Sequence, residues 1–130
     1  MSSKKVSDCN SSVNPREHDE QAQFVRMVEA AYPAEIAALL FAIPNGANKS
    51  LSARMRFKAE GLRPGVPDLF FAYPHKGYAG LFIEMKRRHG GAVSMEQKAY
   101  IAALRDCGYM VEVCRGCDEA FDRLRIYLGR

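Results

Sequence analysis

The fold is decided by residues 66–86, which read VPDLFFAYPHKGYAGLFIEMK. Two apolar runs, DLFFAY and LFIEMK, flank a segment that contains Pro and Gly, a pattern typical of a β-hairpin. A turn centred on Lys76 places Leu69 opposite Ile83. Because side chains alternate along a strand, the residues on that side of the hairpin are all apolar. This side is therefore predicted to face the core.

The opposite side of the hairpin carries charge. The same register places Asp68 opposite Glu84, and period-two alternation adds Lys86 beside Glu84. Directly opposed carboxylates have Cβ atoms about 5 Å apart and repel each other, so a compensating positive charge is expected. Mg²⁺ prefers oxygen ligands and would supply that charge, with Lys86 close to the attacking water or the phosphate. The alternative is a solvent-facing charged stripe in which Lys86 bridges the two acids.

The rest of the chain alternates helical and strand patterns. This interleaving predicts an α/β fold, in which a mixed β-sheet that contains the antiparallel hairpin is flanked by helices. Residues 1–14 are rich in Ser, Asn and Lys and are predicted to form a flexible leader, which leaves 15–130 as the folded domain. The expected helices are 16–32, 34–40, 50–60, 94–107 and 118–128, and the expected further strands are 39–43 and 109–114.

Length and composition bound the class of protein. The chain has 130 residues, of which 48% are hydrophobic and 26% charged, and this suits one compact core. Its apolar runs are all shorter than the roughly 18 residues of a membrane span, and polar residues follow the N-terminus where a signal peptide has an apolar core. We therefore expect a cytoplasmic protein with no membrane partner.

The first predicted helix carries an acid on its apolar side. At about 100° per residue, Glu17 falls on the same stripe as Phe24 and Val28, whereas Glu20 sits towards the edge of that stripe. A carboxylate at this place either stabilises the positive end of the helix dipole or supplies a further oxygen to the metal site, directly or through water. Both explanations stay open.

Two shorter motifs have local explanations. Ser94 and Gln97 have the spacing of a capping box, in which two side chains satisfy the first backbone amides of a helix. Cys114 and Cys117 form a CxxC, but no second Cys or His pair completes a set of four zinc ligands. We therefore interpret the CxxC as a turn between a strand and a helix.

Several motifs, in this order and spacing, resemble the VRR-NUC family of the PD-(D/E)xK nuclease superfamily. They span 16–128 and are Glu17 with Gln21, Pro44-Asn45-Gly46, Gly61 and Gly65 before Pro67-Asp68, Gly80 through Lys86, Ser94 with Gln97, and Gly108. A lone PD or ExK is a weak signal, whereas the whole set on the predicted strands is specific. The resemblance implies a restriction-endonuclease-like core.

The same resemblance implies a phosphodiesterase that hydrolyses DNA with Mg²⁺ or Mn²⁺ as its cofactor. It assigns Asp68, Glu84 and the Met85 carbonyl as metal ligands, Lys86 as the catalytic lysine, Glu17 as the family's helical acid, and Gln97 as a contact to the substrate or the attacking water. For Gln97 the capping box remains the alternative.

Short members of the family resemble Holliday-junction resolvases and act as homodimers. The resemblance therefore implies a structure-selective endonuclease that takes branched or junction DNA as its partner, in a bacterial cell or a phage-infected host. Two alternatives stay open. One is a nucleic-acid-binding module without catalysis, which the intact Asp68, Glu84 and Lys86 set disfavours. The other is a flap, exonucleolytic or restriction-type nuclease of the same superfamily.

The net charge of +4 is unevenly distributed. Residues 36–95 carry nine Lys or Arg and three Asp or Glu, whereas 1–35 are net acidic and 96–130 are neutral. A basic segment around two carboxylates is expected where a phosphate backbone is drawn over an acidic metal centre. The substrate-binding candidates are Asn45, Lys49, Arg54, Arg63 and Arg87.

Overall fold

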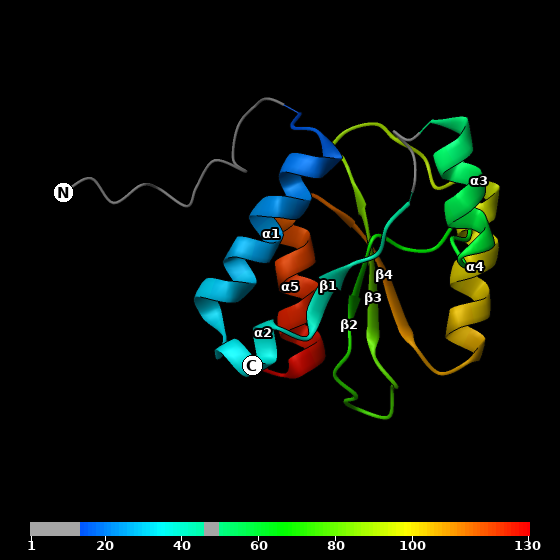
Figure 1. Ribbon diagram of the computed structural model, residues 1–130. Helices are drawn as coiled ribbons and strands as arrows, with labels where there is room; N and C mark the ends of the chain where they lie inside the picture. The colour runs from blue at the N-terminus through cyan, green and yellow to red at the C-terminus, as the bar shows by residue number, and fades with distance from the viewer. Residues whose placement is uncertain (1–13, 46–49) are drawn as a thin grey trace.

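A four-stranded mixed sheet forms the centre of the molecule in the computed structural model, which describes residues 14–45 and 50–130 (Figure 1). The strands lie in the order β1-β2-β3-β4. The β1–β2 and β2–β3 pairs are antiparallel, and β4 runs parallel to β3. Their bounds are Leu40–Ala42 for β1, Leu69–Phe71 for β2, Leu81–Lys86 for β3 and Met110–Arg115 for β4.

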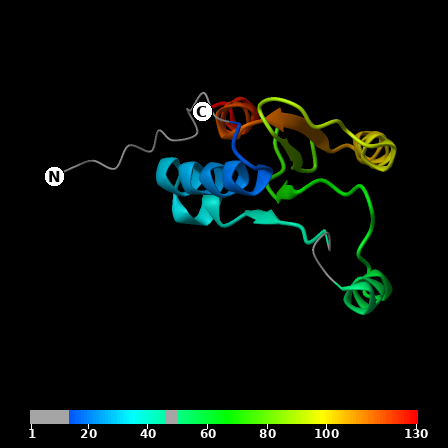
Figure 2. The same cartoon turned by 90° about the horizontal axis from the view of Figure 1, so that it is seen from above.

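Helices cover the two faces of the sheet unequally. Figures 1 and 2 show α1 (Glu17–Ala31) and α5 (Cys117–Leu128) together on one side, and α4 (Met95–Asp106) on the other side. The short α2 (Ala34–Ala37) leads from α1 into β1. Seen from above, α3 (Leu51–Ala59) lies apart from both layers (Figure 2). The predicted α/β fold with helices flanking a mixed sheet is confirmed.

The predicted hairpin register is also confirmed. Leu69 pairs with Ile83, as the turn centred on Lys76 requires, and Phe70 pairs with Phe82 on the opposite side of the sheet. Their two rings stack with centroids 4.3 Å apart. Leu69 and Ile83 are fully buried, so the apolar side of the hairpin does face the core.

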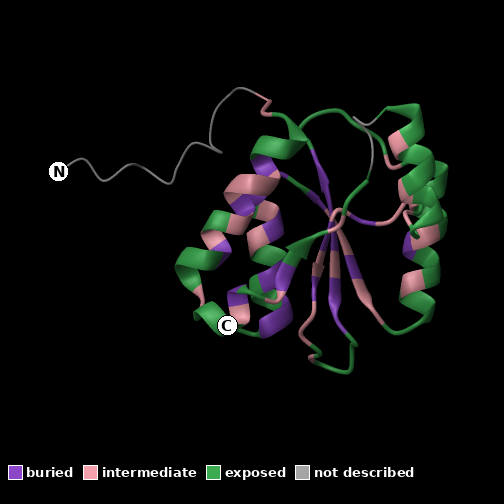
Figure 3. Cartoon of the chain, viewed as in Figure 1, coloured by how far each residue is buried: buried purple, intermediate pink, exposed green. Residues whose placement is uncertain are grey.

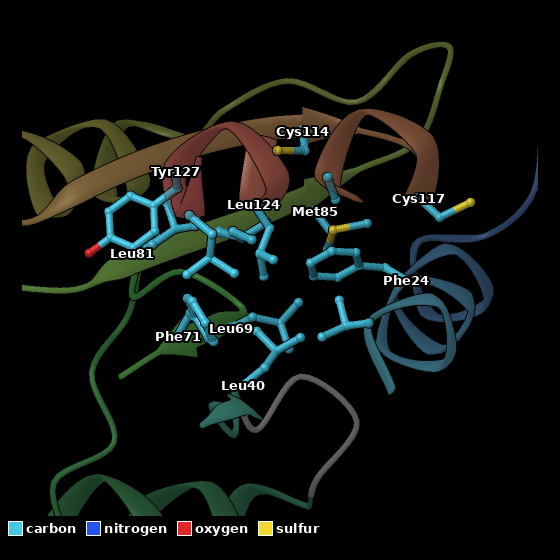
Figure 4. Close-up of a cluster of buried hydrophobic side chains, with 14 of the residues drawn as sticks. Phe24, Leu40, Leu69, Phe71, Leu81, Met85, Cys114, Cys117, Leu124 and Tyr127 are labelled. Carbon is cyan, nitrogen blue, oxygen red and sulfur yellow. The ribbon is translucent and has the colours of Figure 1, made fainter. Parts of the chain in front are cut away.

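The core lies between the sheet and the α1–α5 layer. Figure 4 shows side chains from β2 and β3 meeting Phe24 of α1 and Leu124 of α5. All of these side chains are excluded from solvent, and the hydroxyl of Tyr127 in α5 donates to the Tyr73 carbonyl across 2.6 Å. By contrast, α3 contains no buried residue, which Figure 3 shows as a helix in green and pink. The sheet and two helices therefore form the stable body of the domain.

Helix α1 buries a different acid from the one that the periodicity predicted. Its buried residues are Glu20, Phe24 and Val28, spaced four apart, whereas Glu17 is exposed in the first turn. The prediction that Glu17 lies on the buried stripe and Glu20 at its edge is therefore wrong. The buried stripe begins at Glu20, whose carboxylate has a buried partner described below.

Two further predictions concern the N-terminal leader and the absence of a membrane span. The predicted leader, 1–14, lies outside the described residues except for Asn14, whose amide pairs with the backbone of His89 through bonds of 2.7 and 3.2 Å. The described helices, in 14–45 and 50–130, are all too short or too polar to cross a membrane.

Candidate active site

Asp68 is fixed where the chain enters β2. The buried Pro67 precedes it. The backbone carbonyl of Asp68 accepts a hydrogen bond of 2.8 Å from the amide of Ile43, which follows β1. Its side chain reaches across to β3, where Oδ2 accepts a hydrogen bond of 2.7 Å from the amide of Met85. Both contacts hold the carboxylate at the end of the β2–β3 ladder.

Glu84 and Lys86 project from β3 on the side of the sheet away from α1 and α5. They alternate with Ile83 and Met85, which are buried in the core. Both charged residues are themselves nearly excluded from solvent, at 2% and 6% relative exposure. Lys86 Nζ lies 3.5 Å from Glu84 Oε2. This burial contradicts the alternative of a solvent-facing charged stripe.

Gln97 links these two charges to helix α4. Its Nε2 donates to Glu84 Oε2 across 3.0 Å, and its Oε1 accepts from Lys86 Nζ across 3.1 Å. The same Oε1 accepts from the backbone amide of Ser94 across 2.9 Å, and the Ser94 hydroxyl accepts from the amide of Gln97 across 3.1 Å. The capping box predicted from sequence is therefore present, and the same residue also belongs to the charged cluster.

A close packing contact holds the approach to Asp68 against the start of α4. Gly65 has φ +86°, and a β-carbon there would come within 2.5 Å of the Glu96 carbonyl oxygen. Only glycine combines this backbone conformation with so close an approach. The segment before Asp68 and the helix turn that carries Gln97 are thus packed directly on each other.

The electrostatics of the cluster are set by the opposed acids. Burial, followed by the negative charge of Asp68 and a hydrogen bond with it, raises the pKa of Glu84 from 4.5 to about 8. Lys86 lowers the pKa, but by less than the other effects raise it. In the absence of a cation, this raised pKa favours the protonated form of Glu84 at neutral pH.

The donor set of the cluster fits a hard divalent cation. Within residues 14–45 and 50–130, no three Asp, Glu, His or Cys side chains form a metal-holding group. The Met85 amide points to the β2 side, and the carbonyl of the next residue, Lys86, accepts from Gly116 on the β4 side. The Met85 carbonyl therefore points to the β2 side of the strand, the side from which Asp68 reaches β3. Two carboxylates and one carbonyl suit Mg²⁺, which keeps several waters in its coordination shell.

Glu17 lies beside the cluster without joining its carboxylate pair. A β-carbon on Gly91 would lie 3.8 Å from Glu17 Oε1 and 3.9 Å from Lys86 Cδ, so both side chains lie next to this glycine. Glu17 is exposed and forms no metal-holding group with two other acids of the described chain. Its role as a direct or water-mediated ligand stays a prediction.

Glu20 has a structural role that the sequence analysis missed. Its Oε2 accepts from Arg88 Nε across 3.1 Å and from the Cys117 amide across 3.2 Å. This carboxylate therefore connects α1, the chain after Lys86 and the start of α5. The sequence signal for its burial was the four-residue spacing from Phe24, which is also the spacing between Phe24 and Val28.

The predicted substrate-binding residues fall in separate places. Asn45, Arg54 and Arg63 line a hollow of about 290 Å³ together with Lys58. Arg87 is exposed after Lys86 and is not part of that lining. Lys49 lies outside the described residues.

The CxxC is a turn, as predicted. It spans the end of β4 and the start of α5. Cys114 is a free, buried thiol, and burial, aided by Glu119 and Glu112, raises its pKa to about 12. A thiol that resists deprotonation in this way is a poor nucleophile and a poor metal ligand.

Comparison with known proteins identifies the family to which the chain belongs. The model of the VRR-NUC domain matches residues 6–118, which is most of the chain. The chain is a member of the VRR-NUC family. A solved structure described as a VRR_NUC domain protein superimposes with a TM-score of 0.78 at 22% sequence identity, and the match covers 90% of this chain and 91% of that one. The search of curated proteins gave no match.

The VRR-NUC family is a family of nucleases. The partner of this domain is therefore a nucleic acid. The superposition shows that the mixed sheet and its helices follow the fold of a VRR-NUC structure. In this VRR-NUC domain the PD residues directly precede β2 and the ExK residues lie on the adjacent β3, where Glu84 contacts Gln97.

Proposed function

We propose that this VRR-NUC domain is a DNA endonuclease that uses Mg²⁺ or Mn²⁺ to hydrolyse phosphodiester bonds in branched DNA. The observation that carries the proposal is the buried contact network of Glu84, Lys86 and Gln97 beside Asp68. Burial and the neighbouring Asp68 raise the pKa of Glu84 to about 8, as expected where a cation replaces a proton on binding.

In the proposed site, Asp68, Glu84 and the Met85 carbonyl hold the cation. Bound Mg²⁺ or Mn²⁺ would neutralise the phosphate and activate the attacking water. Asp68 keeps its orientation through the Met85 amide, so the carboxylate position is set by the backbone of the neighbouring strand. This rigidity favours catalysis because the ligands need no rearrangement when substrate arrives.

Lys86 supplies positive charge to the reacting phosphate. One of its ammonium donors is bonded to Gln97 and another faces Glu84, which leaves the third for a phosphate oxygen or the attacking water. The ammonium is nearly excluded from solvent, so its attraction for developing negative charge is weakly screened. Gln97 holds both Glu84 and Lys86 and thereby positions ligand and catalytic lysine relative to each other.

The proposed substrate is a DNA junction, cleaved by a homodimer in the manner of a Holliday-junction resolvase. A dimer would place two such sites on the two strands of a branched substrate. Apolar surface for self-association is present on the edge strand β1, where Phe41 is 48% exposed and packs edge-on against Phe70. The basic hollow near α3 would contact the phosphate backbone of the DNA. Such contacts add affinity without sequence preference.

The test is cleavage by the wild-type protein and by Lys86→Ala. Both are incubated with four-way junction, flap, splayed-arm and linear duplex DNA, with and without Mg²⁺. We expect cleavage only by the wild type with metal, and paired symmetric nicks in the four-way junction. A second readout is the thermal shift on adding Mg²⁺, which Asp68→Asn should abolish.

Other outcomes would overturn the proposal in identifiable ways. Cleavage without metal, or undiminished cleavage by Lys86→Ala, would refute the mechanism. Cleavage of linear duplex alone would show that the protein is a restriction-type nuclease. Removal of a single branch would show that it is a flap nuclease. DNA binding with no cleavage of any substrate would assign a binding module.

A further inference from the structure

A second hollow lies next to the active site and has a different chemical character. It measures about 500 Å³, is open to solvent, and is lined by residues of the chain after β1, of α3 and the segment after it, and of α4. This size is within the range of small-molecule sites, about 300–1,000 Å³. Most of its lining is apolar or aromatic: Ile43, Pro44, Phe57, Leu62, Val66 and Tyr100.

The hollow adjoins the catalytic cluster through two of its lining residues. Val66 stands two positions before Asp68, and Tyr100 stands three positions after Gln97 in α4. Residues three apart share a face of a helix, about 4.5 Å apart along its axis. A group bound in the hollow would therefore sit beside a phosphate held at Asp68 and Glu84.

The basic hollow adjoins this one. Leu62 and Arg63 line both. Arg54, Lys58 and Arg63 give the smaller hollow three positive charges. Its described lining residues include no acid, whereas Glu60 lines the larger hollow. An aromatic and apolar hollow joined to a cationic one matches the two parts of a nucleotide, a flat base and an anionic phosphate.

We propose that the two hollows bind one unpaired nucleotide of the DNA substrate, with its base against Tyr100 and its phosphate against Arg54, Lys58 and Arg63. A base within a duplex is stacked on both faces and cannot enter such a hollow, whereas an unpaired base can. The site would thus recognise DNA by the presence of an unpaired base at a branch. This inference rests on the proposed DNA substrate.

The test measures binding without metal, so that cleavage plays no part. A short single-stranded oligothymidine, its abasic counterpart and a fully paired duplex are titrated against the wild type, Tyr100→Ala, Tyr100→Phe and Tyr78→Ala. Tyr78 is a matched control because it is a half-exposed tyrosine in the β2–β3 turn. Melting curves check that each variant is folded.

We expect Tyr100→Ala to weaken binding of the single strand about tenfold, the size of a lost base-stacking contact, and to leave duplex binding within about twofold. Tyr100→Phe and Tyr78→Ala should match the wild type. The abasic strand should bind the wild type and Tyr100→Ala equally, because there is no base to stack.

Equal loss for single strand and duplex, or no loss for either, would overturn the proposal. A change in oligomeric state of Tyr100→Ala, with unchanged binding of the single strand, would instead assign the hollow to a contact between two copies of the chain. Failure of the proposed nuclease activity is visible separately, as a wild-type protein that binds these oligonucleotides but cleaves no DNA with Mg²⁺.

Discussion

The side-chain amide of Gln97 donates to Glu84 Oε2 across 3.0 Å while the same side chain completes the cap of helix α4. The site and the helix start therefore depend on one residue. Ser94 takes part only in the cap, so it offers a way to separate the two roles.

We predict that Gln97→Ala lowers the rate of DNA cleavage by about 10- to 100-fold, because Glu84 and Lys86 lose the group that orients them. Ser94→Ala should destabilise the protein by about 1 kcal/mol through loss of the cap and leave the cleavage rate near that of the wild type. Cleavage rates and urea denaturation of the two variants check this. Equal loss of rate in both would contradict a role for Gln97 in the site.

The raised pKa of Glu84 predicts how the metal-free protein responds to pH. The folded state binds a proton at Glu84 up to about pH 8, whereas the unfolded state releases it near 4.5. The folded state therefore binds more protons across this window, and this contribution to stability is present below pH 4.5 and lost as the pH rises towards 8. Melting temperatures should show this loss, and Glu84→Gln should lack it.

Metal binding is predicted to have the opposite pH dependence. Because the cation must displace the Glu84 proton, the apparent affinity for Mg²⁺ should rise with pH, by up to about tenfold per unit, and level off above about pH 8. Calorimetric titrations at several pH values test this. An affinity that does not change between pH 6 and 8 would show that Glu84 is not a ligand.

The buried pair of Glu20 and Arg88 is predicted to matter for stability. Arg88→Ala leaves a fully buried carboxylate with only the Cys117 amide as a partner, and should cost about 3 kcal/mol in the free energy of unfolding. Removing both charges with Glu20→Gln and Arg88→Met should recover part of this loss. The exposed pair of Arg16 and Asp19 is the control, where Arg16→Ala should cost less than about 0.5 kcal/mol by urea denaturation.

Affinity for DNA should fall steeply with salt, since it depends on phosphate contacts. Arg54→Gln should reduce the slope of log affinity against log salt by about one, the effect of one lost phosphate contact. Arg26→Gln, which removes an exposed charge on α1, should leave the slope unchanged. Equal slopes for the wild type and Arg54→Gln would show that this hollow does not contact DNA.

The sequence predicted the hairpin and the charged pair well because both depend on local geometry. Period-two alternation and one turn position are enough to place Asp68 near Glu84, and the structure has that register. The fold class likewise follows from the alternation of helical and strand patterns along the chain.

Helix α1 shows where local geometry was insufficient. Periodicity placed Glu17 on the buried stripe and Glu20 at its edge, whereas the structure buries Glu20. Its partner Arg88 lies far away in sequence. The second role of Gln97 likewise arises from the packing of Gly65 on α4, a contact between distant segments. Such tertiary partners are not encoded in any single stretch of sequence.

The separation of α3 from the body of the domain has a consequence for how such enzymes diversify. Glu84 and Lys86 lie on β3, which is bonded to a strand on each side, whereas α3 buries no residue. Sequence changes in α3 can therefore accumulate with little effect on folding or on the chemistry. An exchange of this helix between related domains should alter which DNA is cut while the catalytic centre is inherited intact.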